Sequence, residues 1–78
     1  MVYPNPDHKE VNVLVDLNES ASIEIRLFDA MGRVVIQESS YRDATFIQTL
    51  NLESLSARMY IVQVKIGKII MTERLVKK

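Results

Sequence analysis

Several residue types are scarce or absent in this sequence. Its 78 residues include no cysteine, no tryptophan, one histidine, two prolines and two glycines. Without cysteine the chain cannot form a disulfide, a thiolate metal site or a cysteine nucleophile, and one histidine alone cannot build the usual kind of zinc site. The fold must therefore be held together by packing, and a domain of this size gains only about 3–5 kcal/mol from a single core.

Long apolar runs are also missing. No stretch approaches the roughly 18 apolar residues of a membrane-spanning helix, and Met1–Pro6 has neither the basic nor the apolar region of a secretory signal peptide. The content of 47% hydrophobic and 26% charged residues is typical of a globular chain. We expect one domain over residues 1–78, cut from a larger protein, with Met1 as an added start.

Candidate catalytic and metal-binding residues are few. His8 lies in a polar stretch, where we expect a solvated side chain rather than a general base. Asp7 and Glu10 could help to bind a hard cation, but the neighbouring Lys9 opposes it. No histidine lies near a serine to activate it, and the two glycines are too far apart for a phosphate-binding loop. We therefore expect no enzymatic activity, no cofactor and no metal.

Charge is balanced overall but unevenly distributed. Residues 1–53 hold nine acids and four bases, whereas residues 54–78 hold one acid and six bases. We expect the two parts to pair electrostatically and to solvate their strands. The alternative is a basic C-terminal face that a partner binds. Nucleic acid is a poor candidate for that partner, because the bases are few and no aromatic cluster accompanies them.

Apolar and polar residues alternate along most of the chain, with the period of two that half-buried strands show. The pattern predicts six strands, over residues 11–17, 22–29, 33–38, 44–50, 59–66 and 68–76, and a seventh at residues 2–3. Gly32 and Gly67 are predicted to be turn residues because glycine readily adopts a positive φ, and Ser39–Asp43 is predicted to be a loop. Tyr60 is expected to lie in the core or on a sheet face.

The predicted fold is all-β: an immunoglobulin-like β-sandwich of about seven short antiparallel strands. A closed barrel is the alternative.

Four blocks of sequence carry a family resemblance. Residues 3–6 read Tyr-Pro-Asn-Pro, residues 29–35 resemble the pattern D-x-x-G-K-x-V, residues 55–64 resemble L-x-x-G-x-Y-x-V-x-V, and Gly67 precedes a basic end at residues 74–78. In this order they resemble the type A C-terminal sorting domain of the type IX secretion system over residues 2–78. The residues that match the sorting motif are Tyr3, Pro4, Asn5, Pro6, Gly32, Leu55, Tyr60, Val62, Val64, Gly67, Arg74, Leu75, Val76, Lys77 and Lys78.

One residue departs from the family pattern. Arg58 stands where these domains usually have glycine, at the bend before the tyrosine strand. We expect Arg58 to adopt an ordinary φ and the bend to be built differently, because loops accept alternative turns.

The resemblance implies a sorting signal without chemistry of its own. Its cargo, on the N-terminal side of the same chain, would fold in the periplasm, cross the outer membrane and reach the cell surface or the medium. The partners implied are the type IX translocon, an outer-membrane shuttle protein and a sortase that removes the module.

The resemblance also suggests how the signal is recognised. The hairpin Met59–Val76 is expected to offer an edge strand and a basic tip for docking. Lys77 and Lys78 are solvated tail charges by default, and the resemblance assigns them to recognition. Removing residues 74–78 is expected to abolish export and to leave the cargo folded in the periplasm. Tyr3–Pro6 is expected to be a stiff lead-in that caps the sandwich and also separates the module from its cargo.

Two other functions remain open at the level of sequence. One is a surface carbohydrate-binding or adhesive β-sandwich, which would need a platform of exposed aromatic side chains. The other is a structural spacer or dimerisation domain, which would self-associate through an exposed edge strand.

Overall fold

This computed structural model describes residues 9–77 and the backbone of residues 2–4. The described residues form seven strands. The strands are β1 Val2–Pro4, β2 Glu10–Val15, β3 Ala21–Phe28, β4 Val34–Arg42, β5 Phe46–Asn51, β6 Met59–Ile66 and β7 Ile69–Val76. The described residues form no helix, so they hold no helix that is long and apolar enough to cross a membrane. The predicted all-β fold is confirmed, and residues 2–3 belong to a strand as expected.

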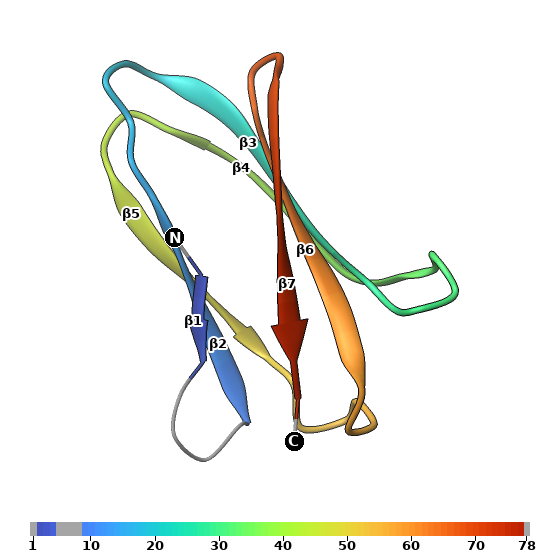
Figure 1. The fold of residues 1–78 in the computed structure, drawn as a ribbon. Helices are drawn as coiled ribbons and strands as arrows, with labels where there is room; N and C mark the ends of the chain where they lie inside the picture. The colour runs from blue at the N-terminus through green and yellow to red at the C-terminus, as the bar shows by residue number, and fades with distance from the viewer. Residues whose placement is uncertain (1, 5–8, 78) are drawn as a thin grey trace.

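The strands form two antiparallel sheets with a core between them (Figure 1). One sheet has the order β1-β2-β5 and the other the order β4-β3-β6-β7. β4 pairs with β3 and not with β5, so the fourth strand is placed differently from that of a constant-type immunoglobulin domain. The two-sheet architecture is the predicted one, and the immunoglobulin-like type stays a prediction.

The core explains the alternating sequence pattern. Every second residue of β2, β3 and β6 points between the sheets, while its neighbours point outward. The buried residues on these strands are Val11, Val13 and Val15, then Ile23, Ile25 and Leu27, then Tyr60, Val62 and Val64. Leu50, Leu52 and Leu75 complete this cluster of buried apolar side chains.

The edges and turns follow from particular residues. Pro4 lacks a backbone donor, and it lies in β1 at the edge of the smaller sheet. Gly32 has a φ of +83° and Gly67 a φ of +58°, as the turn prediction requires. The predicted loop at Ser39–Asp43 is wrong, because β4 pairs with β3 as far as Arg42. β4 is an edge strand with few buried side chains, so a polar sequence does not prevent this pairing.

Candidate functional site

The strand β7 forms a long exposed edge at the C-terminal end of the domain (Figure 1). It pairs with β6 alone, from Ile66 opposite Ile69 to Met59 opposite Val76. All eight of its residues except Leu75 are exposed. Four of the exposed ones are apolar, namely Ile69 (64% exposed), Ile70 (56%), Met71 (50%) and Val76 (55%). An uncovered apolar edge of this length is typical of a surface that another protein covers.

The residue after β7 ties this edge to the loop between β5 and β6. The ammonium of Lys77 donates hydrogen bonds to the carbonyl oxygens of Leu52 and Leu55. Its backbone N–H donates to the carbonyl of Arg58 at 3.0 Å, which extends the β6–β7 ladder by one pair. The expectation that Lys77 is a solvated tail charge is therefore wrong. The sequence could not show this role, because both carbonyl partners of the ammonium lie more than 20 residues away.

Tyr60 anchors the same loop from the other side. Its ring is buried, and its hydroxyl donates a 2.7 Å hydrogen bond to the backbone carbonyl of Ser56, four residues earlier. A tyrosine at the start of a strand that bonds back to the preceding corner is a known feature of immunoglobulin-like sandwiches, the tyrosine corner. The prediction that Tyr60 is a core residue is confirmed, and its hydroxyl contact supports the immunoglobulin-like interpretation.

The bend that the family usually builds with glycine is formed here with Arg58. The two glycines of the chain, Gly32 and Gly67, both have a positive φ and lie in other turns. The side chain of Arg58 is exposed and its carbonyl accepts the bond from Lys77. The expectation of an ordinary φ at Arg58 stays a prediction.

The described residues of the sorting motif between Gly32 and Lys77 form a core group and a surface group. Those with side chains in or against the core are Leu55, Tyr60, Val62, Val64 and Leu75. Those at the surface are Gly32, Gly67, Arg74 and Val76, while Lys77 is half-buried. Among the described side chains of the motif, those at the surface are the ones that a partner can reach in the folded domain. Half of these ten described motif residues thus contribute to the core rather than to the exposed surface.

The N-terminal part of the motif is only partly described. Tyr3 and Pro4 lie in β1, opposite Asn12 and Val11 of β2. Asn5, Pro6 and Lys78 lie outside the described residues, as do Asp7 and His8, the other candidates of that stretch. Within the described side chains, no group of three histidine or acidic residues is placed to hold a metal ion.

The sequence motif did not reveal the role of Asp29. The side chain of Asp29 is buried at the turn between β3 and β4, and its Oδ1 accepts hydrogen bonds from the backbone N–H groups of Met31 (2.9 Å) and Arg33 (3.0 Å). Its Oδ2 accepts one from Nε of Arg33 at 2.8 Å. The backbone bond from Arg33 is the main cause that lowers the pKa of Asp29, although burial opposes the shift. Aspartate three residues before glycine is a usual turn signal and could have indicated this role.

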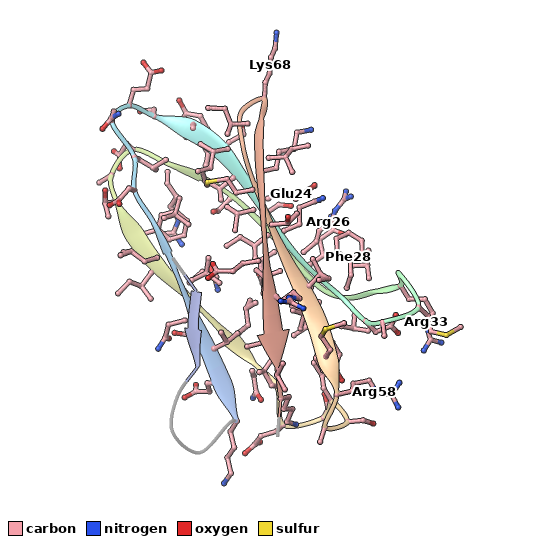
Figure 2. All side chains as sticks on the ribbon, viewed as in Figure 1. Glu24, Arg26, Phe28, Arg33, Arg58 and Lys68 are labelled. Carbon is pink, nitrogen blue, oxygen red and sulfur yellow. The ribbon has the colours of Figure 1, made fainter. Side chains whose placement is uncertain are left out.

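The ion pairs that join described residues lie within the acidic N-terminal part of the chain. Arg26 pairs with Glu24 and Arg33 pairs with Asp29, and both pairs lie within residues 1–53. The expected electrostatic pairing of the two parts stays a prediction. Figure 2 shows Lys68 and Arg58 at opposite ends of the hairpin β6–β7, so these bases do not form one continuous face.

Aromatic side chains form no binding platform in the described region. Tyr60 is buried, and Phe46 is half-buried with the guanidinium of Arg42 4.3 Å from its ring centre. Phe28 is half-buried on the outer face of the larger sheet, and Tyr41 is exposed. A surface that binds sugars through stacked aromatic rings has no counterpart among these residues.

Comparison with known proteins agrees with this arrangement. No curated protein sequence matches the chain. A family model described as the secretion system C-terminal sorting domain matches residues 1–78, which is the whole sequence. Such a domain is attached to a cargo that the type IX machinery exports across the outer membrane. The chain belongs to the family of C-terminal sorting domains of the type IX secretion system.

Proposed function

We propose that this domain directs its cargo to the type IX translocon by presenting the β7 edge, and that a sortase then removes the domain. The observation that carries the proposal is the exposure of β7, with Ile69, Ile70 and Met71 uncovered beside an unshared backbone edge. A partner strand added to this edge gains main-chain hydrogen bonds from the backbone and specificity from the side chains. In this proposal the domain is a ligand and a substrate of the machinery and performs no reaction itself.

Charged residues on the β6–β7 hairpin also support the β7 edge as the docking surface. Arg74 and Lys68 are exposed and form no ion pair within the described part of the chain. Unpaired charges at the rim of a docking site speed the encounter with an oppositely charged partner and orient it. The outer-membrane components that receive β7 are accordingly proposed to carry acidic groups near the docked strand.

Cleavage by the sortase is proposed at the other end of the domain. β1, the first strand, lies at the edge of the smaller sheet, and the proposed junction with the cargo lies next to it. A processing enzyme can reach such a junction without opening the core. The cargo is proposed to pass through the periplasm, and the sortase to release it or to join it to the surface.

An export assay tests the proposal. Residues 2–78 are fused behind a periplasm-directed fluorescent reporter and expressed in a bacterium with a type IX system, beside a strain without the translocon. Reporter at the surface or in the medium only when the translocon is present is the expected result. Reporter retained in the periplasm of both strains would contradict the proposal and would favour a binding module.

A matched pair of substitutions tests the role of β7 itself. Ile70→Lys places a charge on the β7 edge, and Ile47→Lys places one on β5, the edge strand of the other sheet; the two side chains are 56% and 54% exposed. Export is expected to fall for Ile70→Lys and to persist for Ile47→Lys, with similar unfolding midpoints for both. Equal export of the two variants would exclude the β7 edge as the docking surface.

Truncation is a weaker test than these substitutions. Removing residues 74–78 deletes the buried side chain of Leu75 and the hydrogen bonds of Lys77. Loss of a buried leucine alone costs about 2–5 kcal/mol, comparable with the stability of a domain of this size. The truncated cargo is still expected to stay in the periplasm, but unfolding of the module would be a sufficient cause.

A further inference from the structure

A polar cavity lies between the turn that joins β3 to β4 and the loop that joins β5 to β6. Its volume is about 280 Å³. The two segments meet because β3 ends where β6 begins, with Phe28 opposite Ile61. The charged and hydroxyl-bearing residues that line the cavity are Asp29, Arg33, Ser54, Ser56, Arg58 and Tyr60. No lining residue belongs to β7, so this cavity is separate from the proposed docking edge.

The acceptor groups at this cavity already have hydrogen-bond partners. Asp29 is the acidic residue of the lining, and its Oδ1 accepts from the backbone N–H groups of Met31 and Arg33. Its Oδ2 accepts from Nε of Arg33 at 2.8 Å. The carbonyl of Ser56 accepts from the hydroxyl of Tyr60 at 2.7 Å. A carboxylate bonded in this way is compensated within the domain, so the cavity is not arranged to bind a cation.

Several donor groups, by contrast, have no partner within the described residues. Arg33 uses its Nε for Asp29, and its two terminal nitrogens make no hydrogen bond there. The side chain of Arg58 and the hydroxyls of Ser54 and Ser56 also make none. Both arginine side chains extend on the same side of the domain (Figure 2). The bond to Asp29 orients the guanidinium of Arg33 before any ligand arrives.

This set of donors favours an anion with several acceptor oxygens. A phosphate monoester has three strong acceptor oxygens and a charge of about −1.5 to −2 at neutral pH. Two guanidinium groups supply paired N–H donors that match phosphate oxygens, and the two hydroxyls add further donors. A carboxylate has one charge and two oxygens in one plane, which a single arginine satisfies. The donor set therefore fits a phosphoryl group better than a carboxylate.

The size and charge of the cavity indicate a small ligand. Small-molecule pockets have volumes of about 300–1,000 Å³, so this cavity lies at their lower limit. Val35 and Leu55 are the apolar lining residues, and they offer a wall for the carbon skeleton of a small ester. The lining has two positive charges and one negative charge, and the ammonium of Lys77 adds a positive charge at the carbonyl of Leu55.

We propose that the cavity between the β3–β4 turn and the β5–β6 loop binds a phosphoryl group, either as free phosphate or as the head of a small phosphate ester. Arg33 and Arg58 bind its oxygens through their guanidinium groups. The hydroxyls of Ser54 and Ser56 donate to the oxygens that remain. The bound group joins the two segments that line the cavity, and it adds a binding site to a domain whose proposed function needs none.

Titration of the 78-residue chain, followed by the NMR shifts of its backbone amides, tests the proposal. Inorganic phosphate is added at neutral pH and constant ionic strength, with glucose 6-phosphate as the ester and acetate as the carboxylate control. Saturable shifts at the amides of residues 29–33 and 54–58 are expected with phosphate and not with acetate. Saturation with both phosphate compounds would assign an ester to the site, and saturation with inorganic phosphate alone would assign the free ion.

Matched arginine variants show whether the shifts come from this cavity. Arg58→Gln removes a guanidinium from the cavity and Arg74→Gln removes one from β7; both side chains are exposed and unpaired within the described residues, so both variants are expected to fold. Arg58→Gln is expected to raise the Kd for phosphate by about tenfold or more, and Arg74→Gln to leave it unchanged.

Three results would overturn the proposal: shifts that do not saturate with phosphate, equal saturation with acetate, or an equal Kd for the two variants. The titration measures binding in solution and involves no export. Its failure would therefore leave the sorting function untouched, and a failed export assay would leave the phosphoryl site untouched.

Discussion

The hydrogen bonds of Lys77 give the sharpest prediction about stability. Lys77→Met keeps a long unbranched side chain and removes the ammonium that binds the carbonyls of Leu52 and Leu55. Hydrogen bonds that involve a charged group contribute about 1.5–3 kcal/mol. We take one such contribution rather than two, because carbonyls of a surface loop can regain water when the ammonium is lost. The expected decrease in the free energy of unfolding is about 2 kcal/mol.

That decrease is large for a small domain. A domain of this length has roughly 3–5 kcal/mol of stability from its core, so about half of it would be lost. The melting temperature falls by about 4–8 °C per kcal/mol in this size range, which predicts a decrease of roughly 8–16 °C. The loop at residues 52–58 is expected to lose its amide protection first, because the bonds of Lys77 hold it to the end of β7.

Urea unfolding followed by circular dichroism measures the effect, with Lys68→Met as the matched control. Lys68 is exposed at the tip of the β6–β7 hairpin and makes no hydrogen bond or ion pair within the described residues. Its replacement is expected to change the free energy of unfolding by less than about 0.5 kcal/mol. Equal midpoints for the two variants would refute the structural role assigned to Lys77.

Two further predictions concern the anchored loop and the β3–β4 turn. Tyr60→Phe keeps the buried ring and removes the hydrogen bond to the carbonyl of Ser56. The free energy of unfolding in the same urea experiment is expected to fall by about 0.5–1.5 kcal/mol. An unchanged midpoint would show that this hydrogen bond does not contribute to stability. The pKa of Asp29 is lowered in the folded domain. The ionised carboxylate therefore adds to the free energy of unfolding, fully at pH values above its unfolded-state pKa of about 3.9. This contribution is lost as the pH falls through the folded-state pKa. Urea midpoints at pH 3 and pH 6 are therefore expected to differ less for Asp29→Asn than for the unsubstituted chain, and an equal difference would contradict the role of this carboxylate.

The sequence predicted the strands that bury one face. In β2, Val11, Val13 and Val15 alternate with polar or half-buried residues, because one side of the strand lies in the core. The edge strand β4 has few buried positions, so residues 39–42 carried no alternating signal and were interpreted as a loop. The pairing of β4 with β3 depends on backbone groups, which composition does not reveal.

The candidate site was predictable only where local sequence determines it. Gly32 and Gly67 could be placed in turns because the positive φ required there favours glycine. Lys77 could not be assigned, since its role depends on loop carbonyls that approach only when both sheets have formed. The charge imbalance suggested pairing between the two parts of the chain, but net charge says little about which side chains meet.

The contacts of the motif residues limit how export defects can be interpreted. Leu55, Tyr60 and Lys77 all act on the loop before β6, and this loop is bonded to the end of β7. A substitution at any of them would change the support of the β7 edge even if no partner touches the residue. Loss of export in such a variant is therefore no evidence of contact with the translocon. Contact is shown only by an exposed position such as Ile70, where export falls while the free energy of unfolding stays unchanged.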